Sequence, residues 1–194
     1  ITIDPHKLGY VPYACGAFLT PDAGRYAVSA FDAPYLDRPE LGEGKWTSTL
    51  EGSRSAAGAA ATWLTAETIG FDADGFGALM AATVDARRAF QAAVRDAVPE
   101  ARFLPADSNI ACFSLARSGE ALSYSNARTG AVFDHFQTSP DFAVSKTTLG
   151  RDNAALMASV LAGHGGYDDA PDGHSGMLVI RCVFMNPYWS EPSV

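Results

Sequence analysis

The spacing of apolar residues along the chain predicts short strands and a helix in its first part. Residues 13–20 form a mixed apolar run and residues 26–31 alternate, with the turn sequence 21–24 between them, so we predict a β-hairpin or two neighbouring strands. The alanine-rich residues 53–68 favour a helix. Residues 32–52, between these segments, show no periodicity and are predicted to form a long loop.

The second part of the chain combines both periodicities. Apolar residues recur at helical spacing from Asp74, the predicted N-cap, to Pro99, and Arg87 is placed on the solvent face of this helix. A further helix is predicted at residues 123–137. Strand-like runs are predicted at four places, residues 102–104, 109–115, 142–149 and 177–185. Strands separated by helices indicate a small α+β unit.

Composition narrows the classes of partner. The chain has 194 residues, of which 47% are hydrophobic and 19% charged, as in ordinary globular proteins. Its formal net charge of −8 argues against a nucleic-acid or anionic-membrane partner, and we expect neither. Three widely spaced cysteines read as buried free thiols without metal-binding spacing, so we expect a cytoplasmic protein with no metal site.

The strongest chemical signal lies at the start of the chain. The β-branched run Ile1-Thr2-Ile3 ends in Asp4-Pro5-His6-Lys7, and Gly9 and Pro12 follow. A lysine held in a tight turn at a strand end is suited to Schiff-base formation, which requires a fixed and partly unprotonated amine. The alternative is that Lys7 is one ordinary lysine among three.

Residues 4–13, with the sequence DPHKLGYVPY, closely resemble the cofactor-lysine motif of pyridoxal-phosphate-dependent amino-acid decarboxylases of group II, fold-type I, and most of all the tyrosine decarboxylase branch. Residues 49–55 and 180–188 resemble two further blocks of that family. The resemblance implies an α/β fold, a fragment of a fold-type I enzyme. Residues 1–72 would be the C-terminal part of the large cofactor-binding domain, and residues 73–194 the small α+β domain.

The same resemblance implies roles for the residues around the lysine. Lys7 would hold pyridoxal 5'-phosphate as an imine, and His6 and Asp4 would contact the cofactor. The alternatives are a structural histidine and a turn-forming aspartate before proline. Tyr13 would be a catalytic phenol that donates a proton after carbon dioxide leaves. It could equally be a core aromatic residue.

Three more candidates lie further along the chain. Ser53 stands at the predicted helix start, where exposed N–H groups suit an anion, and the resemblance implies contact with the cofactor phosphate of a neighbouring subunit; a plain N-cap is the alternative. Tyr35, in the long loop, is a candidate for substrate binding by resemblance. Arg181 interrupts an apolar strand and needs an anion, either the substrate carboxylate or an internal acidic partner.

The resemblance implies decarboxylation of an L-amino acid, an aromatic one and tyrosine above all. It places two cofactor-binding residues of the family before the lysine motif. We therefore expect a fragment or one half of a split enzyme, inactive alone, whose site is completed by an N-terminal segment or subunit and which forms a homodimer. The alternatives are a related lyase, an aldehyde-forming decarboxylase-oxidase or a carbon–carbon bond-forming enzyme on the same scaffold, and a non-catalytic partner subunit or remnant.

Overall fold

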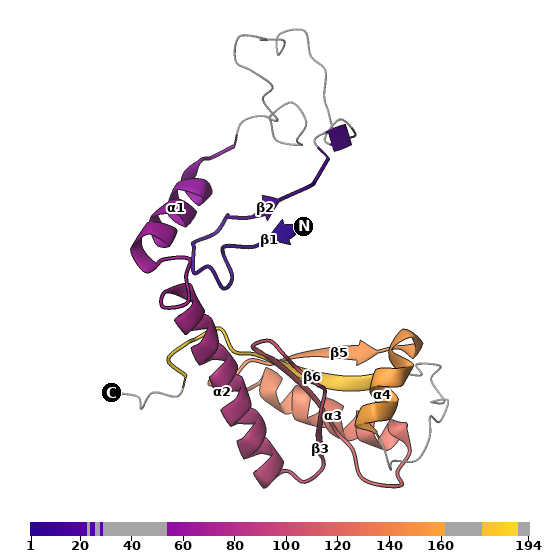
Figure 1. The fold of residues 1–194 in the computed structure, drawn as a ribbon. Coiled ribbons are helices and arrows are strands. Elements are labelled where there is room, and N and C mark those ends of the chain that lie inside the picture. The colour runs from indigo at the N-terminus through magenta and orange to yellow at the C-terminus, as the bar shows by residue number, and fades with distance from the viewer. Residues whose placement is uncertain (23, 26–27, 29–53, 162–175, 190–194) are drawn as a thin grey trace, which may run out of the picture. The chain divides into compact units, whose positions relative to one another are not determined.

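A computed structural model describes residues 1–22, 24–25, 28, 54–161 and 176–189. The chain divides into two compact units, Ile1–Phe76 (unit 1) and Gly77–Val194 (unit 2). Helices and strands are interspersed along the chain (Figure 1), which confirms a mixed α/β composition. No helix in the described ranges has the length and apolar character needed to cross a membrane. Those ranges also contain no cluster of side chains suited to a metal ion.

Unit 1 contains two very short strands and one helix. Strand β1, Thr2–Ile3, pairs antiparallel with β2, Ala17–Phe18. The N-terminal amino group donates to the Leu19 carbonyl at 2.8 Å and extends this pairing by one residue. The predicted hairpin joined residues 13–20 to residues 26–31. The structure pairs β2 with β1, and most of residues 26–31 lie outside the described residues.

Helix α1, Ala57–Ile69, begins four residues later than predicted. Its first N–H group, that of Ala57, donates to the Ser55 hydroxyl at 3.1 Å, so Ser55 closes the turn before the helix. The helix is rich in small residues and has no buried side chain. The N–H groups that we predicted to lie at Ser53 therefore lie further along the chain.

Helix α2, Phe76–Ala97, is preceded by a turn that an aspartate closes. The Asp72 carboxylate accepts the N–H groups of Asp74 and Gly75 at 3.0 and 2.7 Å. The prediction that Asp74 caps this helix is not confirmed, because the helix begins at Phe76 and the carboxylate that accepts N–H groups in the preceding turn is that of Asp72. The placing of Arg87 in solvent was also wrong, because its guanidinium is buried and donates to the Ser108 carbonyl and to Gln91.

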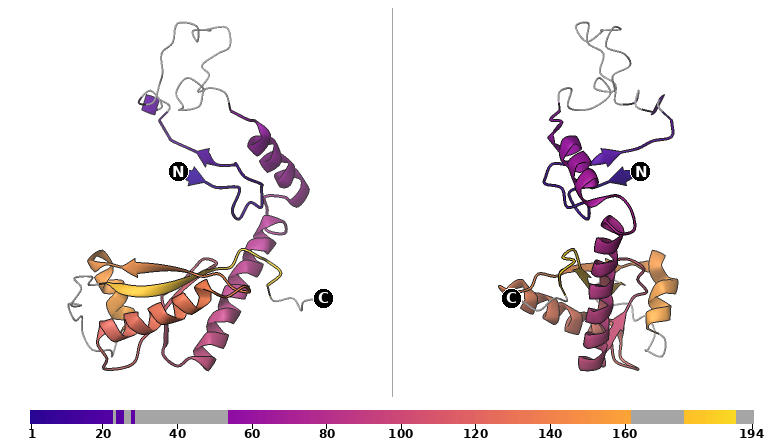
Figure 2. Two further views of the ribbon diagram at one scale, coloured as in Figure 1. Left: turned by 180° about the vertical axis from the view of Figure 1, so that it is seen from behind. Right: turned by 60° about the vertical axis from the view of Figure 1, so that its left-hand side comes forward.

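Unit 2 is built on a four-stranded antiparallel sheet in the order β3-β4-β6-β5. These strands are β3, Ala101–Phe103; β4, Ile110–Leu115; β5, Ser145–Leu149; and β6, Met177–Val183. On one face Phe113 and Ile180 pack against apolar side chains of α2 and of α3, Leu122–Gln137. On the other face Met157 of α4, Ala154–Val160, packs with Met177 and Val179. Figures 1 and 2 show α3 running along this sheet.

Side chains of α3 bond to the backbone of β4 and β6 beyond the last residue pair that joins these two strands, Phe113 and Ile180. The backbone N–H of Leu115 donates to the Thr129 hydroxyl, and its carbonyl accepts from Ser125, both at 3.0 Å. On the other strand, the Asn126 amide accepts from the N–H of Leu178 and donates to the Gly176 carbonyl, both at 2.8 Å. Polar side chains of α3 thus satisfy backbone groups that would otherwise be buried without partners.

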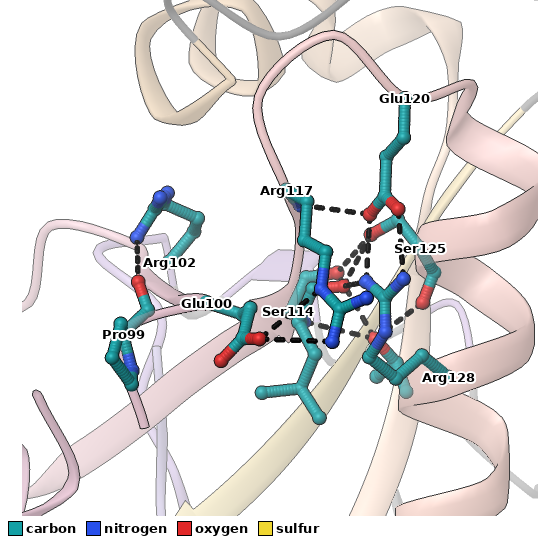
Figure 3. Close-up of polar contacts among 10 residues, drawn as sticks. Pro99, Glu100, Arg102, Ser114, Arg117, Glu120, Ser125 and Arg128 are labelled. Carbon is teal, nitrogen blue, oxygen red and sulfur yellow. Dashed lines mark hydrogen bonds and ion pairs between the residues drawn. The ribbon is translucent and has the colours of Figure 1, made fainter. Parts of the chain in front are cut away.

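An ion-pair network closes the turn between β4 and α3 (Figure 3). Arg128 makes a bidentate contact with Glu120, with both N–O distances 2.7 Å, and Arg117 pairs with Glu100 at 3.0 Å. The hydrogen bond from Arg128 is the largest cause that lowers the pKa of Glu120 from 4.5 to about 2. Such a bidentate, charge-assisted pair is among the stronger polar contacts in proteins.

Candidate functional site

The residues around Lys7 form two consecutive backbone turns. The N–H of Lys7 donates to the Asp4 carbonyl at 2.9 Å, and the Lys7 carbonyl accepts from Tyr10 at 3.1 Å. Gly9 approaches Pro5 so closely that a Cβ atom would lie 2.6 Å from the Pro5 carbonyl oxygen. This position therefore excludes any other residue without a backbone shift. The turns hold the Lys7 side chain at the end of β1, as the sequence predicted.

The amine of Lys7 lies against a carboxylate. Its Nζ atom is 2.6 Å from Asp4 Oδ2, and the two side chains are 59% and 39% exposed. The hydrogen bond from Lys7 is the largest cause that lowers the pKa of Asp4 below its usual value, with smaller Coulombic contributions from Lys7 and His6. A carboxylate at this distance favours the charged ammonium form of the lysine.

Lys7 also borders a hollow in unit 1 with a volume of about 590 Å³. This volume is within the range of small-molecule sites. The polar residues that line it are Asp4, Lys7, Thr62 and Thr65, and the remainder of the lining, which includes Val11 and Phe71, is largely apolar. Both threonine hydroxyls come from α1, where each donates to the carbonyl four residues earlier.

His6 and Tyr13 lie together, outside this hollow. Their ring centroids are 4.3 Å apart with an interplanar angle of 34°, and the His6 ring also contacts the Cys15 carbonyl. Tyr13 is 81% exposed. The structure therefore pairs Lys7 with Asp4 and His6 with Tyr13, and Tyr13 does not pack in a core within the described residues.

A contact between the turn region and α1 was not apparent from the sequence. The Cys15 thiol lies 3.1 Å from the Thr62 hydroxyl and 3.3 Å from the Gly58 carbonyl. A Cβ atom at Gly58 would lie 2.8 Å from the Ala14 carbonyl oxygen. The glycine among the alanines of α1 is the signal that could have indicated this close approach.

Arg181 belongs to unit 2, in β6. It lies directly opposite Cys112 of β4 and borders a hollow of about 580 Å³ with Asp107, Ser108 and Thr147. Its side chain is half-buried, and no carboxylate among the residues that the structure describes lies within ion-pair distance of it. Within those residues the structure thus offers no internal salt bridge for Arg181.

The cysteines near Arg181 are poor candidates for nucleophiles. All three cysteines of the chain are free and half-buried. Burial raises the pKa of the Cys112 thiol, and it raises that of Cys182 to about 11. Because the thiolate is the reactive form, these side chains stay unreactive near neutral pH. The remaining predicted site residues, Ser53 and Tyr35, lie outside the described residues, and their roles stay predictions.

Comparison with known proteins gives one consistent relationship. The chain is 33% identical over 93 residues to an L-tyrosine decarboxylase of Enterococcus faecium, and 41% identical over 63 residues to a probable L-tyrosine/L-aspartate decarboxylase of Methanothermobacter thermautotrophicus. It is 36% identical over 72 residues to an L-aspartate decarboxylase of Thermococcus kodakarensis. Part of this chain is homologous to amino-acid decarboxylases.

The homology to the decarboxylases is partial on both sides. The matches cover 47%, 32% and 37% of this chain, and 15%, 16% and 18% of the three decarboxylases. No family model matches the chain. The resemblance found in the sequence is therefore confirmed as a partial homology to tyrosine and tyrosine/aspartate decarboxylases.

Proposed function

We propose that this chain is the part of a fold-type I amino-acid decarboxylase that carries the cofactor lysine and the small domain. The observation that carries the proposal is the 33–41% identity with L-tyrosine and L-aspartate decarboxylases. The turn geometry at Lys7 supports it, since the lysine is fixed by backbone hydrogen bonds at the rim of a hollow. We also propose that residues 1–72 belong to the large cofactor-binding domain and residues 73–194 to the small domain.

The residues at the Lys7 hollow fit pyridoxal 5'-phosphate in the chemistry of their donors. Lys7 supplies the primary amine that an aldehyde requires, and the hollow has the size of a small-molecule site. Asp4 and Lys7 supply polar groups in a lining that is otherwise largely apolar, which suits an aromatic ring. We propose that Lys7 binds the cofactor covalently and that Asp4 contacts it. Cofactor contacts of His6, which lies outside the hollow, and of Ser53, which lies outside the described residues, stay predictions from the sequence resemblance. When bound, this cofactor supplies an electron sink for the pair of electrons left by the carboxylate.

Asp4 controls the state of the lysine in this scheme. The Lys7 ammonium and the Asp4 carboxylate form a close pair, and only the neutral amine attacks an aldehyde. The proton on Nζ therefore has to leave before the cofactor binds, and the carboxylate oxygen 2.6 Å away opposes this loss because it stabilises the ammonium form. Once the lysine charge is lost, Asp4 becomes available for another donor.

The substrate would be held by unit 2. We propose that the Arg181 guanidinium binds the substrate carboxylate, because a half-buried arginine without an acidic partner among the described residues favours an anion. Tyr13 would donate a proton, and Tyr35 would contact the substrate. L-tyrosine is the first candidate and L-aspartate the second, since both names occur among the relatives. We also propose that a further segment or subunit supplies the part of the relatives that this chain does not cover, and that the complete unit forms a homodimer.

The test is reductive labelling of the lysines. We would incubate the purified chain with pyridoxal 5'-phosphate, reduce with borohydride, and locate the adduct by peptide mass spectrometry. The chain has three lysines, so Lys45 and Lys146 are internal controls. We expect the adduct on Lys7 in clear excess. Equal labelling of all three lysines would contradict a cofactor site at Lys7.

The activity is tested separately by release of carbon dioxide. We expect the chain alone to release none measurable from L-tyrosine or L-aspartate, because it spans only 15–18% of the length of the relatives compared above. Measurable release by the chain alone would contradict the need for a further segment. Release of ammonia or an aldehyde instead would favour a related reaction on the same scaffold.

A further inference from the structure

Arg87, in α2, is a buried arginine whose charge no acidic side chain in the described residues neutralises. The residue is only 7% exposed, although the apolar pattern placed it in solvent. Its Nε atom donates to the Ser108 carbonyl at 3.0 Å, and its Nη1 atom donates to the Gln91 side chain at 2.6 Å. Among the residues that the structure describes, no carboxylate lies within ion-pair distance of its guanidinium.

Net stability alone does not explain an arginine at this position. The guanidinium keeps its charge at any ordinary pH. Burying a charge without an opposite charge is costly, and a well-packed apolar side chain is often at least as stabilising. Gln91, which is itself 5% exposed, holds a second edge of the guanidinium from one helical turn further along α2. The arrangement therefore indicates a role in holding the Ser108 carbonyl in place.

Ser108 belongs to the β3–β4 loop, residues 104–109, and this loop has a second buried anchor. Asn109 is 7% exposed, and its side-chain amide donates to the Phe184 carbonyl at 2.7 Å. In return, the N–H of Phe184 donates to the Asn109 carbonyl at 3.0 Å. Arg87 thus connects the loop to α2, and Asn109 connects it to the backbone just after β6.

The β3–β4 loop also forms one wall of the hollow that Arg181 borders. Residues 104–108 all line this hollow, and Arg181 reaches it from β6, three residues before Phe184. Because the two anchors fix the loop relative to α2 and to the end of β6, they also fix this wall relative to Arg181. No described residue of the hollow holds the Arg181 guanidinium in an ion pair, so the wall limits the space open to it.

We propose that Arg87 is a positioning residue for the carboxylate site at Arg181. Through the Ser108 carbonyl it holds the β3–β4 loop in place, so that a carboxylate meets Arg181 in a preformed hollow. Preformed sites bind more tightly because less conformational freedom is lost on binding. The inference rests on the proposed role of Arg181, and Arg87 itself does not line the hollow.

The test begins with an NMR titration of the full chain. The probe is 3-(4-hydroxyphenyl)propionate, which is L-tyrosine without its amino group and therefore cannot form an imine with a cofactor. We expect saturable shifts of the amide signals of Cys112 and Thr147, which line the hollow. Arg181→Gln should abolish these shifts. No binding, or binding that persists in Arg181→Gln, would contradict the proposed role of Arg181 and not the role of Arg87 in the loop.

The decisive variant replaces Arg87 and Gln91 by methionine together. Removing both members of a buried hydrogen-bonded pair is often nearly neutral for stability, and water can reach the exposed Ser108. We expect a little-changed midpoint of unfolding but a carboxylate affinity about tenfold lower, because the site is no longer preformed. Arg88→Gln, which removes an exposed arginine of the same helix paired with Asp85, should leave the affinity unchanged.

Amide hydrogen exchange without any ligand tests the loop directly. The N–H of Ile110 donates to the Ser108 hydroxyl at 3.3 Å, so its exchange reports on the loop. In the double variant this exchange should become about tenfold faster, while the amides of residues 112–114 in β4 keep their rates. If the double variant does not fold, Arg87→Lys, which keeps the charge but not the planar donor group, provides the same comparison.

The results that overturn the proposal are specific. Unchanged exchange at Ile110 in a folded variant would show that Arg87 does not hold the loop. A fall in stability with unchanged carboxylate affinity would show a purely structural role. An equal loss of affinity in Arg88→Gln would indicate non-specific attraction by the positive charges of α2.

Discussion

The two units of the chain differ in where their large apolar side chains lie. Unit 2 buries Phe113, Ile180 and Met177 in connected clusters on both faces of its sheet. In unit 1, Val11 and Phe76 are the buried apolar side chains among the described residues. Its large exposed apolar residues there are Ile1, Ile3, Tyr13, Phe18, Leu19, Val28, Trp63, Leu64 and Phe71.

The two units therefore hold their candidate functional side chains in position in different ways. Unit 2 places Arg181 by building it into a central strand of a packed sheet. Unit 1 places Lys7 through backbone turns that involve few buried contacts. Because hydrophobic stabilisation scales with the apolar area removed from water, the described residues of unit 1 contribute little to it. The position of the lysine is thus a local property of residues 4–11.

The largest predicted effect on stability is the difference between substitutions of two phenylalanines. Phe113 is 7% exposed in the core of unit 2, and Phe18 is 59% exposed in unit 1. Phe113→Ala should lower the free energy of unfolding by about 3–5 kcal/mol through lost burial and a cavity. Phe18→Ala should change it by less than about 0.5 kcal/mol. Denaturant unfolding followed by circular dichroism measures both, and a comparable loss in Phe18→Ala would show that the comparison is wrong.

The next effect concerns how α3 joins β4 to β6. Asn126→Ala removes two hydrogen bonds from the start of β6, which should cost about 2 kcal/mol of unfolding free energy at roughly 1 kcal/mol each. Gln137→Ala, on the same helix, removes only a long contact of 3.4 Å and serves as the control. Thermal or urea unfolding gives both values. Equal stability of the two variants would mean that water replaces the asparagine without cost.

Much of unit 2 could be predicted because its segments carry strong periodicity. The strand at residues 109–115 and the helix at 123–137 agree with the observed elements to within one residue. Helix α4 escaped prediction because its seven residues, Ala154–Val160, are too few to show a helical repeat, and packing of Met157 fixes it. The pairing of β2 with β1 was missed because it depends on contacts between residues 14 and 16 positions apart, which no local pattern encodes.

The sequence predicted the geometry of the candidate site only where backbone contacts between nearby residues determine it. The turn at Lys7 follows from the Asp-Pro and Gly positions, and the structure contains it. The pairing of Lys7 with Asp4, and of His6 with Tyr13, depends on side-chain conformations that a sequence pattern does not specify.

A smaller effect should appear as a dependence on pH in unit 2. The folded state lowers the pKa of Glu120 from 4.5 to about 2, so its pairing with Arg128 stabilises fully above pH 4.5 and is lost as the pH falls toward 2. Glu120→Gln should therefore cost about 1–2 kcal/mol at pH 7 and almost nothing near pH 2. Urea unfolding across this range measures the difference, with Glu67→Gln, an exposed glutamate of α1, as the control. A cost independent of pH would exclude the ion pair as its source.

The smallest effect on stability, and the sharpest on chemistry, is expected at Asp4. Asp4→Asn removes an exposed ion pair, so the midpoint of unfolding should not change measurably. Without the carboxylate the neutral form of Lys7 becomes more accessible, and reductive labelling by pyridoxal 5'-phosphate at neutral pH should become roughly two- to fivefold faster. Lys146 serves as the internal control, because its labelling rate should not change. Its Nζ atom lies 4.3 Å from the centre of the Phe133 ring in unit 2. A slower reaction at Lys7 alone would instead mean that Asp4 acts mainly by accepting the proton or by holding the lysine in its reactive orientation.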